Sequence, residues 1–230
     1  MSPAIPERPA THDGRSPGRE VITGDALPWL RSQTSRTGAC VVTSLPDLSE
    51  VRMDPAAWSV WFVGAAERCI RLVPDDGAAL FFQSDVRHDG RWIDKAALVH
   101  RAAEAAGARL LFHKIVCRFQ PGHVTGPRPG YTHLLAVSRA LRSSGEPGLP
   151  DVMVDAGRPV WVRAMGPRAA AHAIRFARDQ AGARLIIDPF CGVGTVLAVA
   201  NALGLDALGV ELSARRAEQA RRLEVHPDDL

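Results

Sequence analysis

The sequence predicts a domain of the α/β class, in which helices cover both faces of a mainly parallel β-sheet. Short apolar segments, several of them rich in β-branched residues, alternate with segments whose apolar residues recur at helical spacing. This alternation begins at Val21 and continues to Leu223. Strands that alternate with helices pair in parallel, and helices then bury both faces of the sheet.

The boundaries of the expected elements follow from this periodicity and from turn-forming residues. We expect strands at residues 21–22, 39–43, 78–83, 109–117, 131–138, 184–187 and 207–210. We expect helices at residues 26–31, 55–71, 94–106, 166–180, 195–203 and 213–223. Pro55 stands in a first helical turn, where proline is favoured, and Gly107 follows an expected helix end.

Composition limits the class of protein. The chain has 230 residues, of which 46% are hydrophobic, so one globular domain is expected and a wholly disordered chain is excluded. Residues 1–20 are rich in Pro, Gly, Ser and charge, which predicts a disordered tail before a domain at residues 21–230. No apolar run reaches the roughly 18 residues that span a bilayer, and no signal peptide is evident. We therefore expect a cytoplasmic protein without membrane contact.

The net charge and the cysteines indicate which binding partners, disulfides and metal sites to expect. The net charge of +3 permits a nucleic-acid partner without requiring one. The four cysteines are far apart in the sequence, with no C-x-x-C pair, and each lies in or beside an apolar run. We therefore expect neither a disulfide framework nor a metal site.

One segment has the pattern of a ligand-binding loop. An apolar strand at residues 184–187 leads into Asp188-Pro-Phe-Cys-Gly-Val-Gly-Thr195, and a helix follows. Gly192 and Gly194 would let backbone N–H groups approach a ligand closely, and the helix N-terminus favours a ligand carboxylate. Glu211 closes the next strand, where a carboxylate can accept hydrogen bonds from ribose hydroxyls. The alternative is a tight strand–helix turn that binds nothing.

The loop is not a phosphate-binding loop, because Gly-Lys-Ser/Thr is absent, and it is not a G-x-G-x-x-G dinucleotide loop. Instead, D-P-F-C-G-x-G-T followed by a strand that ends in G-V-E-L resembles the motifs of amino-methyltransferases that act on DNA bases at cytosine N4 or adenine N6. This resemblance implies a Rossmann-like fold and S-adenosylmethionine (SAM) as cofactor. It assigns cofactor binding to Asp188, Pro189, Phe190, Gly192, Gly194, Thr195 and Glu211.

The position of the motif near the C-terminus resembles the circularly permuted members of that family, in which the catalytic half precedes the cofactor half. The permuted order implies that the strand at residues 21–22 lies beside the strand at residues 207–210. Gly24-Asp25-Ala-Leu27 resembles the family's G-D-A-L segment, which implies that Asp25 hydrogen-bonds the adenine amino group of SAM. We expect the neighbouring Trp29 to be a core residue.

A looser likeness joins residues 162–167 to the family's segment that covers the methionine part of SAM. It implies that Met165 and Gly166 bind the cofactor, with helix capping as an equal alternative. The usual His-Pro and Lys-Pro pairs of that segment are missing here.

The resemblance also locates a catalytic loop. Family members carry D/N/S-P-P-aromatic after the fourth strand, where the first side chain and a backbone carbonyl accept hydrogen bonds from the base amino group and the aromatic stacks on the flipped base. Here the corresponding loop is Ser44-Leu45-Pro46-Asp47. Ser44 and Pro46 match the pattern, whereas Leu45 and Asp47 depart from it. The implied catalytic residues are Ser44, Pro46 and Asp47, where Asp47 acts as hydrogen-bond acceptor or general base, or only as a helix cap.

Later segments resemble the family's substrate-facing strands, which implies acceptor contacts for Lys114, Arg128 and Tyr131. His123 and His133 lie nearby, and we expect His133 to be a satisfied polar residue at a strand end. Residues 139–160 are too few to fold as a separate target-recognition region. Structured RNA, or DNA recognised with the help of a partner, therefore fits better than sequence-specific DNA binding.

The sequence as a whole predicts a SAM-dependent methyltransferase that acts on a base of RNA or DNA. Two alternatives remain at this stage. One is a methyltransferase for a protein or a small-molecule amine, because the stacking aromatic is absent. The other is a SAM-binding subunit that supports a catalytic partner. Either a homodimer or a complex with a partner subunit is compatible with the sequence.

Overall fold

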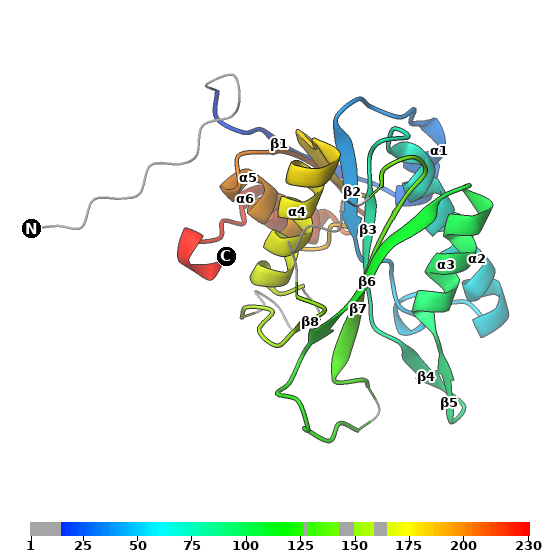
Figure 1. Ribbon diagram of the computed structural model, residues 1–230. Helices are drawn as coiled ribbons and strands as arrows, with labels where there is room; N and C mark the ends of the chain where they lie inside the picture. The colour runs from blue at the N-terminus through cyan, green and yellow to red at the C-terminus, as the bar shows by residue number, and fades with distance from the viewer. Residues whose placement is uncertain (1–14, 127, 143–149, 159–164) are drawn as a thin grey trace, which may run out of the picture.

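An eight-stranded sheet runs through the protein in the computed structural model, which describes residues 15–126, 128–142, 150–158 and 165–230. The strand order is β1-β10-β9-β2-β3-β7-β6-β8 (Figure 1). The strands are β1 (Arg19–Thr23), β2 (Ala39–Thr43), β3 (Ala79–Gln83), β6 (Arg109–Cys117), β7 (Tyr131–Ser138), β8 (Val152–Met153), β9 (Leu185–Asp188) and β10 (Asp206–Glu211). A separate hairpin consists of β4 (Val86–His88) and β5 (Arg91–Ile93).

The strands from β1 to β3 form the parallel half of the sheet, and β7 then pairs antiparallel with both β3 and β6. Within this half, Val21 lies opposite Gly209 and Ile22 opposite Val210. The predicted neighbourhood of the N-terminal strand and residues 207–210 is therefore confirmed. The strand begins two residues before the expected domain start, and the Gly18 amide donates to the Asp206 carboxylate at 2.7 Å.

Helices cover both faces of the sheet, as predicted (Figure 1). One face carries α1 (Ala26–Ser32), α2 (Pro55–Leu72) and α3 (Lys95–Ala105). The other carries α4 (Pro167–Ala181), α5 (Thr195–Ala202) and α6 (Ala214–Arg222). Two short 3-10 turns, η1 (Leu48–Glu50) and η2 (Pro227–Asp229), complete the described elements. No helix in the described ranges is long and apolar enough to span a bilayer.

The helix α2 illustrates how the sequence specifies these layers. Asp54 accepts hydrogen bonds from two amides of the first turn, and Pro55 occupies a position where its missing N–H costs nothing. The fully buried Trp58, Phe62 and Ala65 recur at helical spacing and face the sheet core. The expected core position of Trp29 is also confirmed, because its partly buried ring packs against the same cluster.

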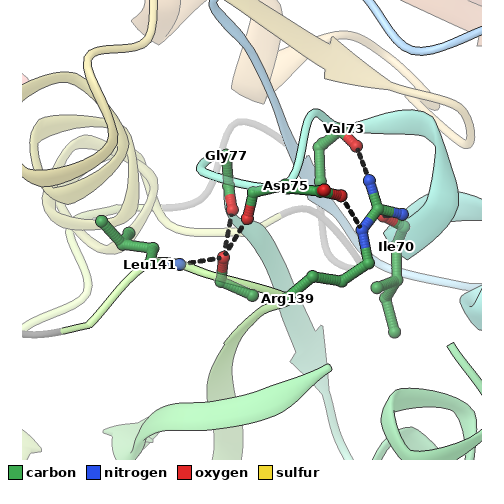
Figure 2. Close-up of polar contacts among 7 residues, drawn as sticks. Ile70, Val73, Asp75, Gly77, Arg139 and Leu141 are labelled. Atoms are coloured by element: carbon green, nitrogen blue, oxygen red, sulfur yellow. Dashed lines mark hydrogen bonds and ion pairs between the residues drawn. The ribbon is translucent and has the colours of Figure 1, made fainter. Parts of the chain in front are cut away.

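The end of β7 is fastened to the segment that precedes β3 (Figure 2). The Arg139 guanidinium donates to the Asp75 carboxylate at 2.7 Å and to the Val73 carbonyl at 2.6 Å. The Ser138 hydroxyl donates to the Gly77 carbonyl at 2.6 Å. These contacts lie at the amino-terminal edge of β3, whereas the ligand-binding edge of a parallel sheet is the carboxyl edge.

The hairpin β4–β5 and the turn η1 are the main elements that the periodicity did not predict. The hairpin is joined by Asp89 and Gly90, which both have positive φ angles, +46° and +74°. Asp-Gly is a common two-residue hairpin connection, so this signal was present in the sequence. The hairpin follows β3 and projects beyond the main sheet beside the β6–β7 connection (Figure 1).

Candidate functional site

Three adjoining cavities lie at the carboxyl edge of the parallel strands, beside the β4–β5 hairpin and the β6–β7 connection. The glycine-loop cavity, about 600 Å³, lies over β9 and β10 and contacts Asp188, Gly192 and Glu211. The lysine cavity, about 580 Å³, contains Lys95 and Asp47. The aromatic cavity, about 720 Å³, lies under the β4–β5 hairpin. Ser44 and Leu45 border both the glycine-loop cavity and the lysine cavity, so these two spaces adjoin.

Asp188 occupies the end of β9, beside the end of β2. Its Oδ1 accepts hydrogen bonds from the Thr43 hydroxyl at 2.6 Å and from the Phe190 amide at 3.1 Å. Burial raises the pKa of the Asp188 carboxyl to about 7, and the negative charge of Glu211 acts in the same direction against these two hydrogen bonds. Asp188 is therefore a buried acid that changes its charge near neutral pH.

Glu211 lies at the end of β10 with only 6% of its surface exposed. Its Oε1 accepts hydrogen bonds from the Ser213 amide at 2.7 Å and from the Arg216 guanidinium at 2.7 and 2.9 Å. Its other oxygen, Oε2, receives no donor from the described residues. The carboxylate is thus held firmly by one oxygen, and the second is available to a hydroxyl donor in the cavity.

The two glycines of the loop serve different purposes. Gly192 has a φ of +55°, and a Cβ built there meets nothing within 4 Å. Gly194 has a φ of +88°, and its Cβ would lie 2.7 Å from the Cα of Ala220 in α6. Close packing against α6 therefore gives a second reason for glycine at position 194, whereas Gly192 borders the glycine-loop cavity.

Other residues of the loop also line the glycine-loop cavity. Thr195 begins α5 and is 4% exposed, yet its hydroxyl has no hydrogen-bond partner among the described residues. A buried hydroxyl without a partner costs free energy, so this atom favours a polar ligand. Pro189 and Phe190 form part of the wall, and the Phe190 ring meets Trp61 edge-on at 6.1 Å.

The remaining predicted cofactor residues divide between the cavities. Asp25 caps α1 through the Leu27 amide at 2.9 Å and borders the glycine-loop cavity. Met165 borders both the glycine-loop and lysine cavities. Gly166 is the N-cap of α4 and borders the lysine cavity, and a Cβ there would lie 2.0 Å from the Ala156 carbonyl. The rest of the segment that resembled the methionine cover, residues 162–164, lies outside the described ranges.

The loop after β2 separates the two cavities. Ser44 is exposed to both, Pro46 borders the glycine-loop cavity, and Asp47 borders the lysine cavity. The Pro46 carbonyl accepts a hydrogen bond from the Trp58 indole at 3.3 Å. Asp47 caps η1 through a capping box with Glu50. The expectation that Asp47 acts as a helix cap therefore accounts for its hydrogen bonds to the backbone. Its carboxylate also faces Lys95, and capping alone does not explain that contact.

Lys95 is the functional candidate that sequence reasoning missed. It is the first residue of α3, and its side chain is only 4% exposed. Its ammonium lies 3.9 Å from the Asp47 carboxylate and 5.8 Å from the centre of the Trp58 ring. Burial lowers its pKa, while the charges of Asp47, Glu50 and Asp85 act in the opposite direction. A helix-start lysine ordinarily faces solvent, so only the tertiary structure reveals this one.

The three residues that were predicted to contact the acceptor lie in different places. Arg128 borders the lysine cavity and Tyr131 the aromatic cavity. Lys114 is part of neither lining, and its ammonium pairs with Asp151 at 2.9 Å. His133 is satisfied as expected: its ring nitrogens lie 3.1 Å from Asp85 and 2.9 Å from His113.

One group in the described chain has metal-like spacing, although no site was expected from the cysteines. Single ligand atoms of Asp85, Asp94 and His133 lie within 4.8 Å of one another. The His133–Asp85 hydrogen bond at 3.1 Å accounts for one of these contacts without an ion. Asp85 and Asp94 also line the aromatic cavity.

Comparison with known proteins places the fold. No protein-family model and no curated protein sequence matches the chain. Among solved structures, a proposed DNA modification methylase from Thermus thermophilus in complex with S-adenosyl-L-methionine superposes with a TM-score of 0.68 at 23% identity, covering 88% of this chain and 91% of that one.

Two further structures agree with this result. The PvuII DNA methyltransferase, which is cytosine-N4-specific, gives a TM-score of 0.68 at 14% identity and covers 92% of this chain and 90% of its own. M1.HpyAVI in complex with SAM gives 0.61 at 13% identity, with 89% and 98% covered. The protein therefore has the Rossmann-like α/β fold found in these solved DNA methylases.

Proposed function

We propose that the protein is a SAM-dependent methyltransferase that transfers a methyl group to an amino nitrogen of a nucleic-acid base. The observation that carries this proposal is the contact between two cavities across Ser44 and Leu45. One cavity has the features of a cofactor site, and the other has polar and charged groups suited to an acceptor. A transferase needs both sites open to each other at one point.

The residues around the glycine-loop cavity fit SAM. The unpartnered Thr195 hydroxyl and the free Oε2 of Glu211 offer polar groups to a ligand, and Gly192 leaves open space beside its Cα. Glu211 would accept hydrogen bonds from the ribose hydroxyls, and Asp25 from the adenine amino group. Asp188 would offer a negative charge to the positively charged cofactor. We also propose that Met165 contacts SAM from the side of the lysine cavity.

When bound, SAM would supply a methyl group attached to a positively charged sulfur, and after transfer of the methyl group this sulfur would be a neutral thioether. The residues of this chain must then orient the acceptor nitrogen and take up the proton that it loses. Ser44 borders both cavities and would accept a hydrogen bond from the acceptor amine. Asp47 would accept the proton, and the buried ammonium of Lys95 would hold the Asp47 carboxylate in place. Pro46 would shape the loop.

A nucleic-acid acceptor suits the outer part of the lysine cavity. Arg118 and Arg128 are exposed there. A guanidinium group can form bidentate hydrogen bonds with the oxygens of a phosphate. The solved structures with this fold include proteins named as DNA methylases. Such polymers are intracellular, which agrees with the cytoplasmic location that we propose.

The test is transfer of tritium from methyl-labelled SAM into total RNA, genomic DNA and protein in parallel reactions. We expect label in RNA or DNA and none in protein. Label in protein alone would move the assignment to the protein methyltransferases. Binding of SAM by calorimetry without transfer to any polymer would favour a non-catalytic partner subunit.

Thr195→Val provides a variant with a specific expectation for the cofactor site. It removes the unpartnered hydroxyl and keeps a similar shape, so folding should be unaffected or slightly stabilised. SAM affinity should fall by about tenfold, which corresponds to one lost hydrogen bond of about 1.4 kcal/mol. Unchanged SAM affinity in Thr195→Val would contradict the role given to this hydroxyl.

A further inference from the structure

The aromatic cavity is a third space that the proposed transfer reaction does not use. It adjoins the lysine cavity, because Cys117, Phe119 and Gln120 line both. A ligand that leaves the lysine cavity past Phe119 would therefore enter the aromatic cavity. Its volume of about 720 Å³ falls in the range of small-molecule and nucleotide sites.

Three aromatic side chains in this cavity are unusually exposed. Trp92 is 51% exposed, Phe119 is 48% exposed and Tyr131 is 38% exposed. Trp92 lies in β5, Phe119 in the loop that follows β6, and Tyr131 at the start of β7, so separate segments bring them to one cavity. His123 already stacks on Phe119 with ring centres 4.8 Å apart and an interplanar angle of 28°. Exposed rings gathered in one hollow are typical of a binding surface.

Two of the polar side chains that line the cavity, Asp85 and Asp94, are carboxylates with fixed positions. The Asp85 carboxylate is held by His133 at 3.1 Å and by the Lys95 amide at 2.9 Å. Asp94 uses one oxygen to cap α3 through the Ala97 amide at 2.9 Å. The Arg87 guanidinium lies 6.0 Å from the centre of the Trp92 ring, so a cation stands beside the aromatic surface.

We infer that the aromatic cavity binds a second nucleobase, one that carries an exocyclic amino group, from the nucleotide next to the methylated base in a single-stranded segment. This inference rests on the proposed function. The rings of Trp92, Phe119 and Tyr131 stack on the base, and Asp94 accepts a hydrogen bond from its amino group. Stacking is open to every base, so the carboxylate supplies the preference for adenine, cytosine and guanine over thymine and uracil.

Charge and shape together favour a base over other occupants. A lipid chain or an apolar peptide would cover the exposed Asp94 carboxylate and give its second oxygen no donor, which costs free energy. A base presents both an aromatic face and amino hydrogens. Its phosphates would lie near the exposed Arg87, Arg118 and Arg128, which border or neighbour the path between the two cavities.

The experiment measures the affinity of the full chain for fluorescein-labelled single-stranded eight-nucleotide probes of deoxyadenosine, deoxycytidine or thymidine, by anisotropy at one salt concentration. We expect the deoxyadenosine and deoxycytidine probes to bind more tightly than the thymidine probe. Trp92→Leu and Phe119→Leu should each weaken binding of the deoxyadenosine probe by about tenfold, within the range for one lost stacking contact. Trp92→Phe should retain most of the affinity.

Asp94→Ser tests the carboxylate, because serine still caps a helix through its single oxygen but has no second oxygen to accept from a base, and Asp94 borders the aromatic cavity but not the lysine cavity. It should remove the preference for deoxyadenosine over thymidine. The matched control is Val124→Ala, since Val124 is 90% exposed in the same loop and does not line the cavity. It should bind all probes as the wild type does.

Wild-type affinity in both Trp92→Leu and Phe119→Leu, with normal melting curves, would overturn the inference. So would a preference for adenine that survives in Asp94→Ser. Failure of the proposed function would show separately, as absent SAM binding or absent methyl transfer in the wild type, since neither is needed to measure probe affinity.

Discussion

The Nζ atom of Lys95 lies 3.9 Å from Oδ2 of Asp47, across the wall of the lysine cavity. Lys95 begins α3 on one side of the cavity, and Asp47 follows β2 on the other. A buried ammonium is costly unless an anion faces it, so the two residues depend on each other. The pair joins the loop that we propose to be catalytic to a helix of the opposite wall.

Replacement of Asp47 distinguishes capping from catalysis. Asp47→Ala removes both the cap of η1 and the partner of Lys95, so we expect a stability loss of about 1 kcal/mol or more. Asp47→Asn keeps the cap and loses the charge. Both variants should lower the methyl-transfer rate by about 100-fold with SAM affinity nearly unchanged. Melting curves, calorimetry with SAM and transfer rates measure the three quantities.

A double-mutant cycle provides the control for this pair. If Lys95 acts through Asp47, Lys95→Met should lower the transfer rate, and adding Asp47→Asn to it should lower the rate little further. Independent effects that multiply would contradict the coupling. Full activity in Asp47→Ala would reduce Asp47 to a cap and leave Ser44 as the catalytic candidate of that loop.

The two glycines of the cofactor loop should respond differently to alanine. Gly192→Ala meets open space and only the strain of a positive φ, so the stability loss should be about 1–2 kcal/mol with clearly weaker SAM binding. Gly194→Ala adds a clash with the Ala220 backbone, which costs roughly 1–3 kcal/mol more. Urea unfolding and SAM calorimetry test this, and equal stability losses in the two variants would argue against it.

Cofactor affinity should depend on pH near neutrality because of Asp188. Its carboxyl has a pKa of about 7, so it gains its negative charge as the pH rises through that value. SAM carries a net positive charge and should bind more tightly above pH 7 than below it. The demethylated product is neutral and should show a weaker dependence. Asp188→Asn should flatten both curves, and an unchanged pH dependence in this variant would exclude Asp188 as its source.

The raised pKa of Asp188 also makes the free energy of unfolding depend on pH. The folded-state pKa is raised above the ordinary value of 3.8, so the folded protein keeps a proton that the unfolded chain releases. The contribution of Asp188 to stability is therefore full below about pH 4 and is lost as the pH rises to about 7. Urea unfolding between these values should show this decline in the wild type and less of it in Asp188→Asn.

The contacts of Arg139 should matter for stability and not for cofactor binding. Arg139→Ala removes hydrogen bonds to Asp75 and to the Val73 carbonyl, with an expected loss of about 1–3 kcal/mol (Figure 2). The exposed Arg142 is the matched control, and Arg142→Ala should melt like the wild type. Since these contacts lie away from the glycine-loop cavity, a large loss of SAM affinity in folded Arg139→Ala would contradict this assignment.

Much of the fold could be predicted from periodicity and from one motif. The strands at 39–43, 109–117 and 131–138 have the expected bounds, because each is an apolar run between clear turn signals. The neighbourhood of β1 and β10 came from the permuted order that the resemblance implied, since no local pattern in Val21 or Ile22 indicates a partner.

The parts that could not be predicted depend on tertiary contacts. The burial of Lys95 depends on residues of three other segments, Asp47, Trp58 and Asp85, which meet only in the folded chain. Gly194 packs closely against α6. In the sequence, a glycine needed for such packing looks the same as a glycine needed for ligand binding. Asp89-Gly90 was a readable hairpin signal, although the strands that it joins have only three residues each.

The pairing of β1 with β10 also sets the order in which the chain can acquire its structure during synthesis. Gly18 and Asp206, which meet at the start of these strands, are 188 positions apart. At roughly 5–20 residues per second, the ribosome needs on the order of 10 to 40 s to make the intervening chain. For that time β1 has no partner strand, and the glycine loop and the acid at the end of β10 do not yet exist. The strand β1 is thus translated long before the strand that pairs with it, and the cleft that would receive the cofactor closes only after β10 has emerged.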